Sequence, residues 1–313
     1  MLGLFKHKLD ETALVAVCPD EGGIPYARVR RHKDQPPTLE LCKVQTVENI
    51  GIRGAEIARI TRAESLDDQV CITTLDIGAY SLLLVEAPDV PSSELRAAIR
   101  WRVKDLIDFH IDDAVIDVFD VPNQRATGSN RMMYAVVARA SAVRSQIDLL
   151  TDAGLNLEVI DIPELALRNI AALLPEDVAG VAMLYLNETS GLITITRQTT
   201  LYLSRRIDMG YGSLGDDLET AVPRLERIVV EIQRSLDYYE SHFSQPQVTN
   251  VVVAPIPQRI AGLDEYLSRQ LGIAVRMLDM NSLIDAEMTL DPGVQAKCML
   301  AIGAALREES KEL

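Results

Sequence analysis

The sequence predicts an α/β fold, and three observations lead to this prediction. Segments rich in β-branched and apolar residues recur along the chain and are typical of strands. Segments whose apolar residues recur at helical spacing lie between them. The length of 313 residues corresponds to roughly two domains of about 150 residues each.

Three segments follow one plan of apolar strand, turn and second strand. They are Leu14–Arg31, Val70–Ala87 and Val181–Ile207. From Ile193 to Thr196 isoleucine alternates with threonine, and β-branched residues at period two favour a strand. Shorter strands are expected at Asn250–Ala254 and Ile273–Leu278. The linker Pro122–Asn130 is expected to be a hairpin loop.

Helices are expected between these strands, and Gly and Pro mark their ends. The expected helices are Ser141–Ala153, Asp161–Leu174, Pro223–His242, Ala261–Leu271 and Pro292–Arg307. Gly154 is a C-terminal cap for the first of them, and Pro175 stops the second. The turn-forming residues Pro175–Gly180 separate a helix from a strand and mark the expected domain boundary.

The stretch Pro91–Pro122 combines an amphipathic helix with an acidic, β-branched strand. The apolar residues recur at helical spacing, as Leu95, Ile99, Val103 and Leu106. The only tryptophan, Trp101, has two interpretations: it is a core residue at the edge of this stripe, or it anchors a partner. Its arginine neighbours, Arg96, Arg100 and Arg102, suit the second interpretation, because Trp and Arg are enriched at binding hot spots.

Composition excludes several classes of function. The net charge of −15 argues against nucleic acid as a partner, because a phosphate-binding surface needs clustered Lys and Arg. The four cysteines are scattered, which suits reduced thiols and not a zinc site. No apolar run reaches the roughly 20 residues that a bilayer requires. The opening Met1–Lys8 is too short for a signal peptide, so a cytosolic location is expected.

Several short segments resemble one family. They are Glu94, Leu95, Ile99, Trp101 and the strand around Asp117, then Asp161–Ala166, Arg205–Ile207 with Gly210, Glu231–Glu240 and Gly303–Arg307. Together they resemble the PilM group of type IV pilus assembly proteins. The resemblance implies an actin-like (ribonuclease H-like, duplicated) two-lobe fold with an extra α/β subdomain in lobe one.

The resemblance also implies a domain organisation and partners. Lobe I would comprise residues 1–177, with the subdomain at about 85–140, and would be completed by the helix 292–308; lobe II would comprise 178–291. In the PilM group a cleft beside the subdomain accepts the cytoplasmic tail of a bitopic, PilN-like membrane protein. The partner-binding candidates are Arg96, Arg100, Trp101 and Arg102. The implied role is that of a cytoplasmic scaffold at the inner face of the inner membrane. It would connect the PilN-like membrane protein to the pilus motor ATPase.

The nucleotide motifs of the actin-like fold are missing. Active relatives hold phosphates in two hairpins that each carry Asp-x-Gly. The corresponding positions here hold Ala16-Val17-Cys18 and Tyr185-Leu186-Asn187, and Asp20 to Gly23 form a tight turn instead. The adenosine loop holds Ala254–Pro257, whose prolines offer no N–H. We therefore expect neither ATPase activity nor a bound cofactor.

One motif points the other way. Asp76-Ile77-Gly78 fits Asp-x-Gly, and it is interpreted either as a plain turn or as a phosphate and magnesium site. The resemblance places it in the hairpin that enters the subdomain, away from the nucleotide cleft. The alternatives that stay open are an active actin-like or sugar-kinase-like ATPase with ATP and magnesium, a filament-forming protein, and the cytoplasmic part of a GspL-type secretion protein.

Two further clusters have weaker functional interpretations. Asp112, Asp113, Asp117 and Asp120 suggest a metal site, but the spacing and glycine of a calcium loop are missing, so a solvated strand face is favoured. Gly212–Asp217 resembles a phosphate loop but lacks the Lys-Ser or Lys-Thr pair. We expect it to lead into a helix.

Overall fold

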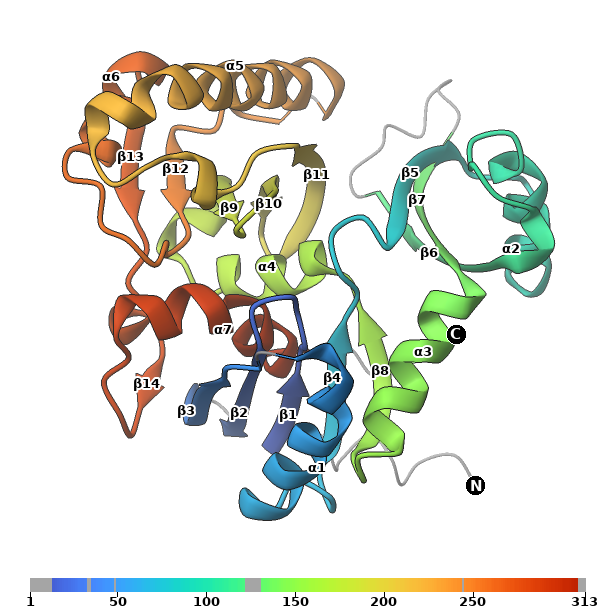
Figure 1. Ribbon diagram of the computed structural model, residues 1–313. Coiled ribbons are helices and arrows are strands. Elements are labelled where there is room, and N and C mark those ends of the chain that lie inside the picture. Colours follow the sequence, from blue (N-terminus) through green and yellow to red (C-terminus); the bar gives the residue numbers. More distant parts are fainter. Residues whose placement is uncertain (1–12, 33–34, 48, 122–130, 244, 309–313) are drawn as a thin grey trace.

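Two large sheets and one small sheet organise the chain (Figure 1). The computed structural model describes residues 13–32, 35–47, 49–121, 131–243 and 245–308. The expected hairpin loop 122–130 and the opening 1–8 lie outside the described residues. Within the described ranges no helix has both the length and the apolar character needed to cross a membrane.

The first sheet has six strands. In spatial order they are β14 (Asp285–Ala286), β3 (Gln35–Gln45), β2 (Ile24–His32), β1 (Ala13–Val17), β4 (Val70–Thr74) and β8 (Asn156–Asp161). The pairs β1–β2 and β2–β3 are antiparallel, whereas β1–β4 and β4–β8 are parallel. The chain thus returns to this sheet at Asp285, ahead of the helix that was expected to complete lobe I.

The second sheet repeats that plan. Its order is β11 (Thr200–Ile207), β10 (Gly191–Arg197), β9 (Val181–Leu186), β12 (Asn250–Val253) and β13 (Ala274–Met277). Again three antiparallel strands are followed by two parallel ones. Strand β9 is buried along its whole length, as expected for the centre of a sheet covered on both faces. The predicted duplication is therefore present.

Helices cover both faces of each large sheet. They are α1 (Arg53–Ala63), α3 (Ala140–Thr151), α4 (Pro163–Ala171), α5 (Leu218–Phe243), α6 (Leu263–Leu271) and α7 (Pro292–Ala305). Helices α1 and α3 share a core with one face of the first sheet, and α5 and α6 share a core with one face of the second. Helices α4 and α7 lie between the two sheets and contribute to one common core (Figure 1).

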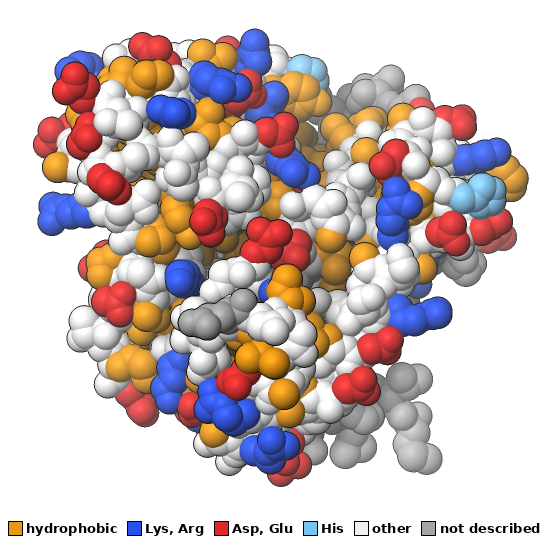
Figure 2. Space-filling view, in the orientation of Figure 1, with side chains coloured by type: hydrophobic (Ala, Val, Ile, Leu, Met, Phe, Trp, Pro, Cys, Tyr) orange, Lys and Arg blue, Asp and Glu red, His pale blue; other side chains and the backbone are white. Residues whose placement is uncertain are grey.

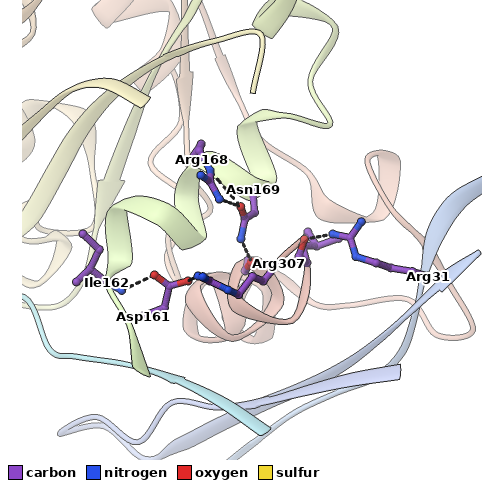
Figure 3. A network of polar contacts seen from close by, with 8 residues as sticks. Arg31, Asp161, Ile162, Arg168, Asn169 and Arg307 are labelled. Atoms are coloured by element: carbon purple, nitrogen blue, oxygen red, sulfur yellow. Dashed lines mark hydrogen bonds and ion pairs between the residues drawn. The ribbon is translucent and has the colours of Figure 1, made fainter. Parts of the chain in front are cut away.

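A buried polar network links the C-terminal end of α7 to β8, α4 and β2 (Figure 3). We call the region where α4 and α7 pack between the two large sheets the junction. Arg307, just after α7, donates to the Asp161 carboxylate at the end of β8 over 2.6 Å. Asn169 of α4 donates to the Gly303 carbonyl over 2.8 Å, and Arg31 of β2 donates to the Leu306 carbonyl. Segments that are far apart in sequence are thereby joined through hydrogen bonds that satisfy buried polar groups.

The third sheet belongs to a subdomain beside the two lobes (Figure 1). Its order is β5 (Tyr80–Glu86), β7 (Met132–Arg139) and β6 (Ala114–Asp120), and it packs against α2 (Ser92–Val103). Ile99 and Val103 of α2 are fully buried in a small core with Val85 and Met133. The helical stripe that the sequence predicted is thus the buried face of this helix, except that Leu106 is exposed.

Two expectations need correction. The segment Val70–Ala87 is not a hairpin, because β4 pairs with β1 and β8 while β5 pairs with β7 in another sheet. Alternating patterns predict strands but not their partners. Helix α5 begins at Leu218 and not at Pro223, because the Asp217 carboxylate accepts the Thr220 N–H over 2.8 Å and caps an earlier start.

Candidate functional site

The turn between β1 and β2 uses several of its own backbone donors in internal hydrogen bonds. The Asp20 carboxylate accepts the Gly22 N–H over 2.8 Å. The Gly23 N–H points to the Asp20 carbonyl at 3.4 Å, and the Asp20 N–H donates to the Gly23 carbonyl at 3.0 Å. This is the tight turn that the sequence predicted. N–H groups that are already bonded within a turn are not free to bind phosphate oxygens.

The equivalent turn of the second lobe, between β9 and β10, is closed in the same manner. The Asn187 side-chain oxygen accepts from the Thr189 N–H at 2.9 Å and from the Ser190 N–H at 2.6 Å. The Asn187 N–H donates to the Ser190 carbonyl at 2.9 Å, as Asp20 does to Gly23. In both hairpin turns, therefore, backbone N–H groups are bonded to the side chain of an Asp or Asn residue.

A cavity of about 510 Å³ lies between these two turns. Its lining includes the acids Asp20, Glu21, Asp76, Glu188 and Asp208 and the bases Arg206 and Lys297. Figure 2 shows acidic side chains gathered at the front of the molecule where the lobes meet. Such a lining attracts cations and repels anions.

Asp76 lies in this cavity, so its expected position away from the cleft was wrong. The residues Asp76 to Ala79 form a tight turn closed by the Ala79 N–H on the Asp76 carbonyl at 2.9 Å, and Gly78 adopts φ of +113°. This turn carries the chain from the first sheet to the subdomain, and the crossing between sheets brings its start to the cleft.

The electrostatics of the cavity oppose a nucleotide. Burial raises the pKa of Asp20, while the N–H groups of Gly22 and Gly23 and the charge of Arg53 oppose that rise. Burial and then the charge of Asp20 raise the pKa of Asp76. Among the described residues no three His, Cys, Asp or Glu side chains gather as a metal site. The five acids of the lining therefore disfavour a triphosphate, because like charges repel.

A second hollow, of about 680 Å³, lies on the subdomain. Its lining is Glu86, Ala87, Pro88, Asp89, Val90, Leu95, Arg102, Asp120, Arg131 and Met133. We call it the subdomain groove. Two ion pairs stand at its side, Arg102–Glu86 at 3.2 Å and Arg131–Asp120 at 2.6 Å. The apolar side chains of Leu95 and Met133 also line it. The groove combines apolar surface with charged groups.

The predicted partner-binding residues fall on two sides of α2. Arg102 lines the subdomain groove, whereas Arg96 and Arg100 pair with Asp117 and Asp112 at 3.4 and 3.2 Å. Asp112 and Asp117, two of the four acids that suggested a metal site, are therefore engaged in ion pairs with arginine. Trp101 is 76% exposed, so its interpretation as a core residue is wrong. The Lys104 ammonium lies 5.8 Å from the centre of its ring.

Sequence reasoning missed a buried joint where the subdomain meets both lobes. The Glu164 carboxylate of α4 accepts from the Tyr80 hydroxyl of β5 and from the Ser204 hydroxyl of β11 at 3.3 Å. The Tyr134 hydroxyl of β7 donates to the Tyr202 carbonyl at 2.9 Å. In sequence Glu164 is one acid in the first turn of a helix, and no local pattern marks it as buried.

Comparison with known proteins gives a fold and no sequence family. No family model matches the chain, and no curated protein sequence matches it. Among solved structures, the PilM-PilN type IV pilus biogenesis complex matches with a TM-score of 0.72 and 17% identity, over 94% of this chain and 97% of that one. The cytoplasmic domain of EpsL, an inner membrane component of the type II secretion system of Vibrio cholerae, matches with a TM-score of 0.52 and 11% identity. That match covers 95% of this chain and 97% of the EpsL chain.

The duplicated sheets and the helices between them, together with these matches, define the class: the chain has an actin-like fold. Within that class its fold is PilM-like, because the match to PilM extends over nearly the whole of both chains.

Proposed function

We propose that this protein is a non-catalytic scaffold of a type IV pilus of the MSHA type or of a related secretion machine, similar in role to the biogenesis protein MshI. It binds the cytoplasmic tail of a bitopic, PilN-like inner-membrane protein and links it to the motor ATPase. It would work in the cytoplasm at the inner face of the inner membrane. The observation that carries this proposal is a PilM-like fold whose central cavity has more acids than bases among its lining residues.

The subdomain groove is the surface we assign to the tail. A short tail can dock as an extended peptide with apolar anchors, and Leu95 and Met133 offer apolar contacts for such anchors. The ion pairs Arg102–Glu86 and Arg131–Asp120 stand beside them and fix the direction of a charged peptide. Trp101 lies exposed on the same helix as Arg102 and extends the contact area.

The test uses a synthetic peptide of the cytoplasmic tail encoded next to this protein, titrated into the full chain. Trp101→Ala is expected to weaken binding by about tenfold if this ring is a hot spot. Its circular dichroism spectrum should stay native, because the side chain is exposed. Val178→Ala is the matched control, since Val178 is also exposed but lies outside the subdomain. Unchanged affinity in Trp101→Ala would remove this residue from the site.

The groove itself is tested by Arg102→Ala, which removes a lining side chain and its ion pair with Glu86. We expect weaker tail binding and a smaller dependence of affinity on salt. Tail binding that persists unchanged in both Arg102→Ala and Trp101→Ala would contradict the assignment of this surface.

The second candidate function is an active, ATP-binding actin-like protein. Asp76 favours it, because this Asp-x-Gly acid does line the cavity between the lobes. Calorimetric titration with Mg-ATP and a phosphate-release assay separate the two proposals. We expect no binding and no release. Micromolar affinity for Mg-ATP that is lost in Asp76→Asn would contradict the scaffold proposal and support the ATP-binding function.

A further inference from the structure

The cavity between the lobes holds more carboxylates than its own cations neutralise. Five acids and two bases are among its lining residues. Of the bases, Arg206 is already engaged with Asp208 at 3.4 Å. Asp20 and Asp76 project from two turns of the first lobe, on either side of β4 in the chain. Carboxylates placed close together repel, and a cation between them relieves that repulsion.

A tyrosine from the second lobe adds an independent observation. Tyr185 of β9 is 6% exposed, belongs to the core between the lobes, and lines the cavity. Its hydroxyl makes no hydrogen bond to any residue that the structure describes. The hydroxyl oxygen is not among the buried atoms that lack a partner, so it is accessible from the cavity, where a ligand can form a hydrogen bond with it. Tyr211 brings a second aromatic side chain to the same cavity.

The chemistry of this lining selects one class of ligand. Anions are disfavoured by the carboxylates and by the closed turns at Asp20 and Asn187. A metal ion lacks a group of three ligands among the described residues. An ammonium group has three N–H donors and can share them among two carboxylates and a phenolic oxygen. Aromatic rings are attracted to the same group.

We propose that the cavity binds the ammonium group of a small aliphatic amine, such as a linear diamine or polyamine, between Asp20, Asp76 and the hydroxyl of Tyr185. Burial raises the pKa of Asp20, and the charges of Arg53 and Lys297 oppose that rise, as a bound ammonium group would. The proposal does not depend on the scaffold function, because the subdomain groove is a separate surface.

The experiment is calorimetric titration of the full chain with spermidine and with putrescine at low salt. We expect one site per chain, with affinity that falls as salt is added. Asp76→Asn should weaken binding by about tenfold, the usual size for a lost charge-assisted hydrogen bond. Tyr185→Phe keeps the ring and should weaken binding by about threefold. Asp68→Asn is the matched control, because Asp68 is exposed and outside the cavity.

The same chemistry could come from a lysine side chain of a partner protein. Lysine methylamide acetylated on its α-nitrogen, which leaves the side-chain amine free, is therefore titrated in parallel. If it binds more tightly than putrescine with the same dependence on Asp76 and Tyr185, the site is confirmed and its ligand is a protein side chain. Thermal denaturation establishes that the Tyr185→Phe protein is folded before its affinity is compared.

Three outcomes would overturn the proposal. The first is no heat of binding with millimolar amine. The second is equal amine affinity in Asp76→Asn, Tyr185→Phe and Asp68→Asn, which would mean unspecific association with an acidic surface. The third is tight binding of Mg²⁺ alone that depends on Asp76, which would make the cavity a metal site.

Discussion

At the junction that α4 and α7 form between the two large sheets, the Asp161 carboxylate and the Arg307 guanidinium are 2.6 Å apart and largely shielded from water. In the subdomain, by contrast, the pairs Arg96–Asp117 and Arg100–Asp112 are open to solvent. Figure 2 shows the subdomain studded with charges of both signs. The junction also brings backbones into contact, whereas α2 carries an exposed Trp101 on its outer face.

This difference separates stability from recognition. Buried charges that lose a partner are costly, so the junction must stay closed for the protein to be folded. Exposed ion pairs contribute little to stability and can be exchanged for contacts with another molecule at low cost. We therefore expect substitutions at the junction to affect unfolding, and substitutions on the outer face of the subdomain to affect binding.

The largest expected effect is that of Arg307→Leu. It leaves the Asp161 carboxylate buried without its cation, and breaking such a pair costs about 3–5 kcal/mol. The free energy of unfolding, measured with urea, should fall by that amount. Adding Asp161→Asn removes the uncompensated charge and should restore part of the loss. If Arg307→Leu were as stable as the parent, the buried pair would not hold the junction.

The next effect is expected inside the subdomain. Ile99→Ala empties part of its small core and should cost about 2–4 kcal/mol. Because this core contains few residues of either lobe, the loss should be local. Hydrogen exchange should rise in β5, β6 and β7 while the two large sheets keep their protection. A uniform rise over the whole chain would show that the subdomain is not a separate unit.

Gly303→Ala tests how closely α4 and α7 pack at the junction. A Cβ at this position would lie 2.3 Å from the Ala166 carbonyl oxygen, so α4 and α7 would have to separate. Overpacking of this kind costs about 1–3 kcal/mol. Gly54→Ala in α1 is the control, because its Cβ meets only a Leu149 methyl at 3.7 Å. The control should leave stability unchanged or raise it.

The smallest effect concerns pH and the joint at Glu164. Burial raises the pKa of this carboxyl, while hydrogen bonds from Tyr80 and Ser204 oppose the rise. A group whose pKa is higher in the folded state stabilises the fold at low pH, and that contribution is lost as the pH rises from the unfolded to the folded value. Glu164→Gln should therefore gain stability relative to the parent as pH increases from 4.5 to 8. Parallel pH profiles for the two proteins would contradict this.

Two pairs of the short segments that the sequence singled out meet in space. Ala166 contacts Gly303 and Asp161 binds Arg307, although these residues are distant in the chain. Arg205 of β11 likewise pairs with Glu231 of α5 at 3.4 Å. The sequence marked these residues individually, but only the folded chain shows that they are contact pairs.

The sequence by itself determined the α/β class and most helices and strands, because these follow from local periodicity and residue type. Only the tertiary structure decided the partners of β4 and β5, the burial of Glu164, the exposure of Trp101 and the position of Asp76. Such properties depend on contacts between distant segments. A pattern read along the chain encodes which face is apolar, but it does not encode which other segment will cover that face.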